Sequence, residues 1–245
     1  MEIRESVALV TGANRGIGKS FVEALQKAGA KKIYAAARDT SSLDTVVAAD
    51  PERIVPLKLD VTDPAQVRAA AERAADTDLL INNAGVAVFG GFMSPQGTKG
   101  ARQEMEVNYF GILDMVRAFA PVLKRNGGGA IVNLASIASH VNFPVLGSYS
   151  ASKAAAHSLT QGIRSELSGQ GTQVIGIYPG PVETDMAKGF DAPKVPPGQI
   201  AEAALEAVVT RTEDVFPDSM SAELHGGLLH DPKAVEKQIG EMRPE

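Results

Sequence analysis

The chain has 245 residues, a net charge of −5 and a pI near 5.5, and this acidic balance argues against a nucleic-acid partner. The absence of cysteine excludes disulfides, thiolate catalysis and cysteine-based metal sites, and we expect no metal. The first residues, MEIRESVALV, carry charges where a secretory signal needs an apolar core, and no apolar run approaches the roughly 18 residues of a membrane span. We therefore expect a cytoplasmic protein without a membrane partner.

Short apolar runs alternate with longer helical patterns along the chain. The runs that we expect to form strands begin at Val7, Lys32, Ile54, Asp78, Ala130 and Gln173, with a weaker seventh at Glu213. The helical patterns cover residues 17–28, 63–75, 100–125, 150–168 and 198–210. Such alternation is typical of successive βα units. We predict an α/β fold in one domain over residues 1–245, with a Rossmann-like, doubly wound, mostly parallel seven-stranded sheet and helices on both faces.

The segment TGANRGIG, from Thr11 to Gly18, lies between the first expected strand and the first expected helix. Glycines let a backbone turn tightly and approach a pyrophosphate, and the free N–H groups at the start of a helix attract its charge. A tight turn that needs glycine for its conformation alone is the alternative interpretation. The position between strand and helix favours a dinucleotide site, because ligands of doubly wound sheets bind beyond the carboxyl ends of the strands.

Two arginines favour a phosphorylated cofactor. Arg15 lies inside the glycine turn, and Arg38 follows the second expected strand, where dinucleotide sites often place an acid for the ribose 2′-hydroxyl. Arginine offers a bidentate, permanently charged fork that suits a 2′-phosphate. We therefore expect NADP(H), while Asp39 leaves NAD(H) open and a solvated role for either arginine is the alternative.

The segment YSASK places Tyr149 and Lys153 on one face of an expected helix, since residues four apart are neighbours on a helix surface. A cation beside a phenol favours the phenolate and is expected to lower the phenol pKa toward a value useful for proton transfer. Such pairs are ordinary surface features on their own. Ser136 at the end of the expected fifth strand favours a catalytic interpretation, because its hydroxyl can donate a hydrogen bond to a substrate oxygen. Asn108 is a fourth candidate, either holding a water on a proton path from Lys153 or bonded to a helix bend.

These motifs together resemble the short-chain dehydrogenase/reductase family over about residues 6 to 210. The resemblance rests on TGANRGIG, LDVTD, NNAG, the helix that carries Asn108, Ser136, YSASK and YPGPVETDM, in this order. It implies a nicotinamide cofactor as hydride source and a catalytic set of Asn108, Ser136, Tyr149 and Lys153. The expected cofactor-binding residues are Gly12, Asn14, Arg15, Gly16, Ile17 and Gly18 in the glycine turn, Arg38 near the ribose 2′ position, Asp60 and Val61 beside the adenine, Asn83, Ala84 and Gly85 along the cofactor, Tyr149 and Lys153, and Pro179, Gly180, Val182 and Thr184 around the nicotinamide carboxamide.

The end of the chain is expected to differ from the family. The segment of about residues 185–200 resembles the family's mobile substrate lid, with a plain surface connection as the alternative. Many relatives end with a strand that commonly joins subunits, whereas this sequence continues as an atypical tail over about 218–245. We expect a homodimer or tetramer and leave a monomer open.

The expected reaction is the reversible, NADPH-dependent reduction of an uncharged ketone or aldehyde to an alcohol, with Tyr149 as general acid/base. Its substrate pocket is expected to be lined by His140, Asn142, Phe143 and Leu146 and by the segment from Phe89 to Met93. A solvated loop histidine is the alternative for His140. One alternative is a 3-oxoacyl-thioester reductase acting on an acyl carrier protein. Another is a non-catalytic NADP-binding sensor, which the intact set of Ser136, Tyr149 and Lys153 argues against.

Overall fold

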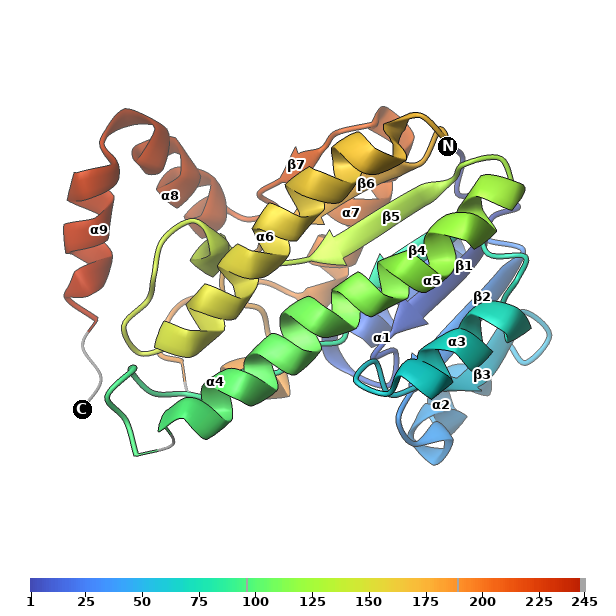
Figure 1. The fold of residues 1–245 in the computed structure, drawn as a ribbon, viewed down its shortest axis with the longest axis horizontal. Coiled ribbons are helices and arrows are strands. Elements are labelled where there is room, and N and C mark those ends of the chain that lie inside the picture. Colours follow the sequence, from blue (N-terminus) through green and yellow to red (C-terminus); the bar gives the residue numbers. More distant parts are fainter. Residues whose placement is uncertain (96, 189, 243–245) are drawn as a thin grey trace.

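The computed structural model describes residues 1–95, 97–188 and 190–242, and the strands in these ranges form one parallel sheet (Figure 1). The strands lie in the order β3-β2-β1-β4-β5-β6-β7. Their bounds are β1 (Val7–Thr11), β2 (Lys32–Ala37), β3 (Ile54–Lys58), β4 (Leu79–Asn82), β5 (Ala130–Leu134), β6 (Gln173–Ile177) and β7 (Asp214–Val215). The predicted seven-stranded doubly wound sheet is therefore confirmed, and the weak seventh run forms a strand of only two residues.

The predicted helices are also present. They are α1 (Gly16–Lys27), α3 (Pro64–Arg73), α5 (Gly111–Arg125), α6 (Gly147–Ser168) and α7 (Pro197–Thr210). Asp63 caps the start of α3 by accepting hydrogen bonds from the Ala65 and Gln66 backbone N–H groups. Pro64 occupies the first turn, where its missing N–H costs no hydrogen bond. The sequence analysis did not assign α2 (Asp44–Val47), α8 (Ser219–His230) or α9 (Pro232–Gly240).

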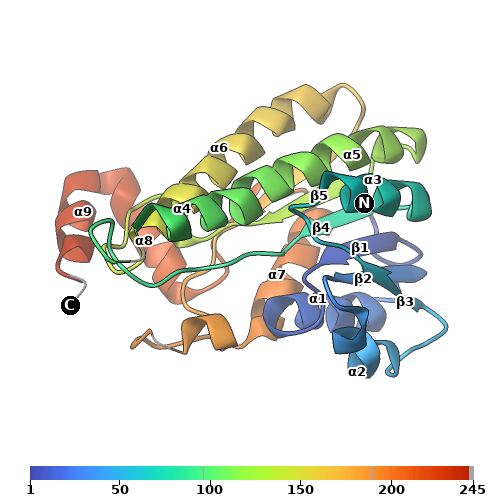
Figure 2. The same ribbon diagram turned by 60° about the horizontal axis from the view of Figure 1, so that its bottom comes forward.

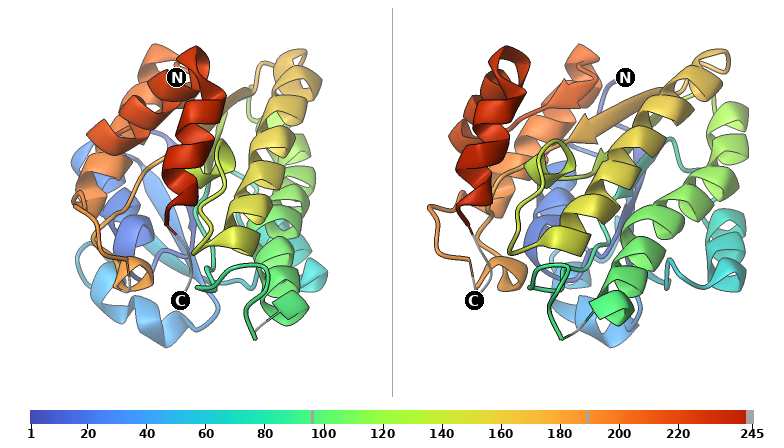
Figure 3. Two further views of the ribbon diagram at one scale, coloured as in Figure 1. Left: turned by 90° about the vertical axis from the view of Figure 1, so that its left-hand side faces the viewer. Right: turned by 60° about the vertical axis from the view of Figure 1, so that its left-hand side comes forward.

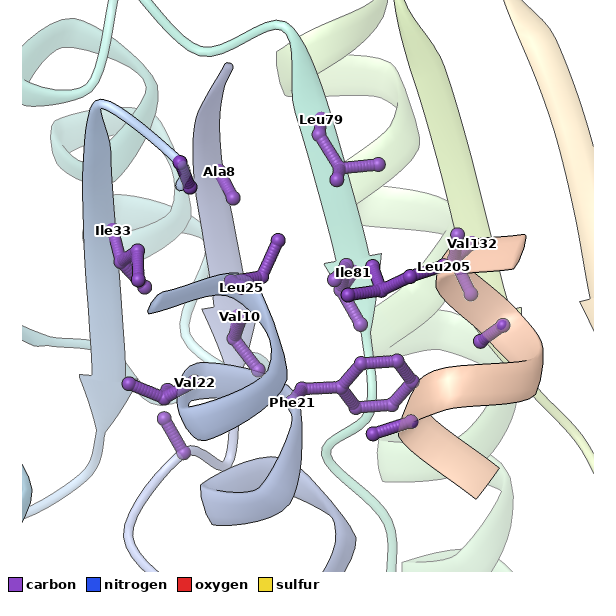
Figure 4. Packing of buried hydrophobic residues seen from close by; sticks show 14 of the residues in the cluster. Ala8, Val10, Phe21, Val22, Leu25, Ile33, Leu79, Ile81, Val132 and Leu205 are labelled. Carbon is purple, nitrogen blue, oxygen red and sulfur yellow. The ribbon is translucent and has the colours of Figure 1, made fainter. Parts of the chain in front are cut away.

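Two layers of helices cover the sheet (Figure 2). Alternate residues of β1 point to opposite faces, as a strand requires: Ala8 and Val10 belong to the hydrophobic cluster under α1 and α7, whereas Val7 and Leu9 belong to the cluster under α3, α5 and α6. In the first cluster Phe21 of α1 extends toward α7 (Figure 4). The central strands β1, β4 and β5 are buried on both faces, which is why they are mostly apolar runs in the sequence.

The expected helix over residues 100–125 is one long rod with a wider turn in its middle. Helix α4 (Gly97–Met105) is followed by a π-helical turn, η2 (Glu106–Phe110), and then by α5 (Figure 2). Such turns are rare and are often found at functional sites. Asn108 lies in this turn.

The C-terminal segment folds as a helical hairpin, in contrast to the unassigned tail expected from the sequence. Helices α8 and α9 lie side by side at the end of the molecule to which β5 points (Figures 1 and 3). Leu224 of α8 and Val235 and Ile239 of α9 are buried in a third cluster, together with Ile137 and Phe143 from the segment after β5. Within the described ranges, no helix is both long and apolar enough to cross a membrane.

Candidate active site

A cavity of about 810 Å³ lies beyond the carboxyl ends of the strands. Ser136, Tyr149 and Lys153 line it, whereas Asn108 does not reach its surface. Every residue expected to bind the cofactor also lines it: Gly12, Asn14, Arg15, Gly16, Ile17, Gly18, Arg38, Asp60, Val61, Asn83, Ala84, Gly85, Tyr149, Lys153, Pro179, Gly180, Val182 and Thr184. The segments after six different strands thus meet at one concave surface, as expected for a ligand site in a doubly wound sheet.

The glycine turn after β1 has the close backbone approach that only glycine allows. A Cβ atom added to Gly18 would lie 2.1 Å from the Gly12 carbonyl oxygen and 2.5 Å from Asn83 Nδ2. The Asn83 amide holds the same turn by donating to the Thr11 carbonyl at 2.8 Å and to that of Gly12 at 3.2 Å. The start of α1, free of side chains at Gly16 and Gly18, fits the pyrophosphate of a dinucleotide.

We expect Gly18→Ala to weaken dinucleotide binding by at least about tenfold and to destabilise the protein by about 1–3 kcal/mol, because the new methyl overlaps backbone atoms. Isothermal titration with NADPH and thermal unfolding measure the two effects. The matched control is Gly162→Ala in α6, where an added Cβ has no neighbour within 4 Å. That variant should bind normally and gain about 0.5–1 kcal/mol, because alanine favours a helix over glycine. Normal binding by Gly18→Ala would contradict the assignment of the turn.

The two arginines expected at the 2′-phosphate have different surroundings. Arg15 forms an ion pair with Asp185 at the start of the expected lid, with Nη1 and Oδ2 3.0 Å apart. Arg38 is exposed at the cavity. Asp39 is engaged elsewhere, since its carboxylate accepts a hydrogen bond from the Ser41 N–H at 3.0 Å and caps the short helix η1 (Thr40–Leu43).

Tyr149 and Lys153 lie together on the first turns of α6, as predicted. The Lys153 side chain is only 4% exposed, and its Nζ lies 5.7 Å from the centroid of the Tyr149 ring. Its Nζ donates a hydrogen bond to the Leu134 carbonyl at the end of β5, 2.8 Å away. Gly85 leaves room beside it, because an added Cβ there would lie 3.6 Å from Nζ. The ammonium group is therefore held between the ends of β4 and β5.

Burial determines the protonation of this pair. It raises the pKa of Tyr149 to about 12, with the charge of Glu104 acting in the same direction and the Ser136 hydroxyl opposing it. Burial also lowers the pKa of Lys153 to about 8. The phenol pKa is therefore raised rather than lowered as the sequence predicted, because the buried phenol loses water and the Lys153 ammonium group hydrogen-bonds to a carbonyl.

Ser136 stands where β5 ends and the short helix η3 (Ile137–Ser139) begins. Its Oγ accepts a hydrogen bond from the Ala138 N–H at 3.2 Å and donates one to the Pro179 carbonyl at 3.4 Å. The cap of η3 thus fixes the hydroxyl at the cavity surface, beside the turn that follows β6.

Asn108 and Glu104 hold the segment that follows β4. Asn108 is fully buried, and its amide exchanges two hydrogen bonds of 2.9 Å with the backbone of Val86 and donates a third to Ser152. One turn earlier, Glu104 accepts a hydrogen bond from the Val88 N–H at 2.7 Å. The sequence analysis missed Glu104, a fully buried acid that an exposed helix pattern does not distinguish from a solvated one.

The part of the cavity near Tyr149 has an apolar wall built from several segments. Phe143 and Leu146 come from the segment before α6, Met186 and Phe190 from the expected lid, and Met220 from α8. Among the expected wall residues Phe143, Leu146 and Phe89 are confirmed as lining the cavity. Met186 and Phe190 lie in the segment expected to be the lid, whereas Met220 was not predicted, because its segment carries no strong pattern.

Three residues expected in this wall, His140, Asn142 and Met93, do not line the cavity. His140 packs in a separate aromatic cluster, 4.7 Å from the ring of Tyr178 and 5.4 Å from that of Phe216. This burial lowers the pKa of His140 to about 4, with His157 adding to the effect, so the ring is neutral near pH 7. Asn142 donates to the Gly147 carbonyl and lies outside the cavity wall, and the side chain of Met93 is 93% exposed.

Comparisons with known proteins agree with this geometry. A family model described as short chain dehydrogenase matches residues 6–194. An uncharacterized oxidoreductase of Staphylococcus saprophyticus is 34% identical over 85% of this chain and 93% of that protein. A short chain dehydrogenase from Burkholderia cenocepacia, solved in complex with NADP, is 43% identical with a TM-score of 0.93 over 98% of this chain and 99% of that one. A short chain dehydrogenase/reductase from Burkholderia phymatum, solved in complex with NAD, is 28% identical with a TM-score of 0.82 over 100% of this chain and 97% of that one.

Proposed function

The chain belongs to the short-chain dehydrogenase/reductase family, and on that premise we propose that it is an NADP(H)-dependent oxidoreductase that interconverts an uncharged ketone or aldehyde and the corresponding alcohol. The observation that carries the proposal is that Ser136, Tyr149 and Lys153 line the same cavity as the glycine turn. The apolar wall beside Tyr149 supports an uncharged substrate, because a charged group would be desolvated there without a partner.

The side chains present can perform the proton chemistry of this reaction. When bound, a reduced nicotinamide supplies a hydride to the carbonyl carbon. Tyr149 donates its phenolic proton to the carbonyl oxygen, which completes the alcohol, and Ser136 stabilises the charge that develops on that oxygen. With a pKa near 12, Tyr149 is protonated at neutral pH and is therefore ready to act as the acid in the direction of reduction. In the direction of alcohol oxidation the phenolate would accept the proton, and the charge of a protonated Lys153 beside the ring would act against the effect of burial.

A nicotinamide absorbance assay tests the proposed reaction. Purified protein is mixed with NADPH or NADH and with a panel of aldehydes, ketones and a 3-oxoacyl thioester. We expect NADPH to be oxidised with apolar ketones or aldehydes. Turnover with the thioester alone would favour the acyl carrier protein reductase, and cofactor binding without turnover on any substrate would favour a nucleotide sensor.

The preference for NADP(H) is supported by charge at the adenosine end of the cavity. Arg38 is exposed there, and Arg15 stands on the neighbouring glycine turn. The acid that could grip a 2′-hydroxyl, Asp39, is turned toward the Ser41 N–H. The Asp39 carboxylate also lines the cavity, but one of its oxygens is engaged in the cap of η1, and the two guanidinium groups are the donors that suit a 2′-phosphate.

We expect Arg38→Asp to weaken NADPH binding by at least about tenfold while NADH binding is maintained or improved, because a charged hydrogen bond is lost and a 2′-phosphate is repelled. The ratio of kcat/KM values for the two cofactors measures the change. Arg125→Asp, at an exposed position in the last turn of α5, is the control for charge and should leave the ratio unchanged. An unaltered ratio in Arg38→Asp would show that Arg38 does not contact the cofactor.

The proposal also covers the domain organisation, the lid, the localisation and the oligomeric state of the protein. We propose that residues 1–245 act as one catalytic domain, that the segment of about 185–200 covers the substrate, and that the protein works in the cytoplasm. The proposed assembly is a homodimer or tetramer. Size-exclusion chromatography with light scattering distinguishes these from a monomer.

A further inference from the structure

We propose that Asp218 is a positioning residue that fastens the turn after β6 to helix α8, so that the C-terminal hairpin is part of the active site. This inference rests on the proposed function, because the turn in question carries Pro179 and Gly180, the expected seat of the nicotinamide. It assigns a role to a segment for which the sequence offered none.

The Asp218 carboxylate is buried and accepts three hydrogen bonds. It is 7% exposed. Its Oδ2 accepts a hydrogen bond from the Gly180 N–H at 2.8 Å and one from the Ser221 hydroxyl at 2.9 Å, while Oδ1 accepts the Ser221 N–H at 2.9 Å. All three donors are neutral groups, two backbone N–H groups and one hydroxyl. The carboxylate is therefore fixed by hydrogen bonds and not by an ion pair. Such hydrogen bonds to a charged acceptor are among the stronger ones in proteins.

Pro179, the neighbour of Gly180, connects this contact to Ser136. The Pro179 carbonyl accepts hydrogen bonds from the Ile137 N–H at 3.0 Å and from Ser136 Oγ at 3.4 Å. The turn is therefore fixed on one side by the segment that carries Ser136 and on the other by Asp218. Loss of the Asp218 carboxylate would remove the side-chain hydrogen bond that joins Gly180 to the start of α8.

The approach between the turn and α8 is close. A Cβ atom added to Gly180 would lie 2.8 Å from Asp218 Oδ1 and 3.5 Å from the Cβ of Met220. Met220, in the first turn of α8, lines the cavity next to this turn. The same carboxylate thus sets the position of the turn and of one residue of the apolar substrate wall.

Capping of α8 alone does not explain these contacts. Asp218 and Ser221 form a reciprocal capping box, which satisfies the start of the helix without Gly180. The hairpin offers a comparison in Asp231, which caps α9 by accepting the Ala234 N–H at 3.0 Å. Asp231 is exposed and lies outside the cavity lining. The two aspartates therefore share the capping role but differ in the contact with the turn.

The test separates the two roles with Asp218→Ser and Asp231→Ala. Serine is a good helix cap, yet its single, shorter oxygen cannot serve both Ser221 and Gly180. The dissociation constants of NADPH and of 2′,5′-ADP, which lacks the nicotinamide half, are measured for both variants and the parent by titration. We expect Asp218→Ser to weaken NADPH binding by about tenfold, the effect of one lost charged hydrogen bond, and to leave 2′,5′-ADP binding within about twofold. Asp231→Ala should leave both constants within about twofold.

Each outcome decides between the inference and its alternatives. Equal binding of NADPH by Asp218→Ser and the parent would show that Asp218 is only a cap, and equal weakening of both nucleotides would show general loosening; either result overturns the inference. Should Asp218→Ser not fold, Asp218→Asn, which keeps one acceptor oxygen, is expected to change the two constants in the same direction. If the parent binds neither nucleotide, the proposed function itself is wrong and the inference falls with it.

Discussion

The Tyr149→Phe variant is expected to lose turnover by about a hundred- to ten-thousandfold, the range over which a positioned acid or base contributes, while it binds NADPH as the parent does. The substitution removes the phenolic oxygen that donates the proton and keeps the aromatic ring, which packs against the third cluster. Steady-state kcat and the dissociation constant of NADPH measure the two halves of the prediction.

A second tyrosine provides the control. Tyr34 on β2 also loses a phenolic hydrogen bond when changed to Phe, that to Asp76 at 2.8 Å, but it lies outside the cavity. Tyr34→Phe should therefore reduce stability slightly and leave kcat unchanged. Turnover by Tyr149→Phe at the rate of the parent would remove Tyr149 from the mechanism.

The Lys153→Met variant is expected to lose both turnover, by at least about a hundredfold, and affinity for NADPH, by at least about tenfold. The cation lies beside the Tyr149 ring and between the ends of β4 and β5, where it can act on the phenol and on the cofactor ribose. The same two assays measure the outcome. A loss of turnover with unchanged NADPH affinity would limit Lys153 to its effect on Tyr149.

The same substitution has a pH-dependent effect on stability. Burial lowers the pKa of Lys153 from 10.5 to about 8, so between these values the unfolded chain binds a proton that the folded protein does not. The stability of the parent relative to Lys153→Met should therefore rise as the pH increases from 8 to 10.5, by up to about 3 kcal/mol. Urea unfolding at several pH values measures this difference.

Because other titrating groups are common to both proteins, their effects cancel in the comparison. Lys124→Met, which removes an exposed lysine at the end of α5, should show a constant difference over the same range. A constant difference for Lys153→Met as well would mean that the folded protein does not disfavour the buried cation.

The fold could be predicted from sequence where local pattern and tertiary burial agree. All five residues of β1 are buried, so the strand is a continuous apolar run, and Asp63 with Pro64 marks the start of α3. The site residues that follow strands were also predictable, because strand ends meet at one edge of a parallel sheet. Tyr149 and Lys153 lie as their spacing on a helix requires.

The rest depends on contacts between distant residues. The capping box of Asp218 and Ser221 could have marked the start of α8, but the helix buries only Ser221 and Leu224 and so has no strong apolar pattern. The hydrogen bond from Gly180 to Asp218 joins residues 38 positions apart, and no local rule predicts it. The pKa of Tyr149 likewise depends on how much water the fold removes from the phenol, which the sequence does not show.

The hydrophobic clusters that stabilise the sheet differ from the cluster that lies beside the expected substrate pocket. The residues that hold the sheet belong to the two clusters on its faces, whereas Phe143, Phe190 and Met220 belong to the third. Substitutions in the third cluster can therefore alter the shape offered to a substrate while most of the free energy of folding is retained. Over evolutionary time such a protein can acquire new substrates through a few changes in its wall and keep the same nucleotide chemistry, and one architecture then serves many reactions.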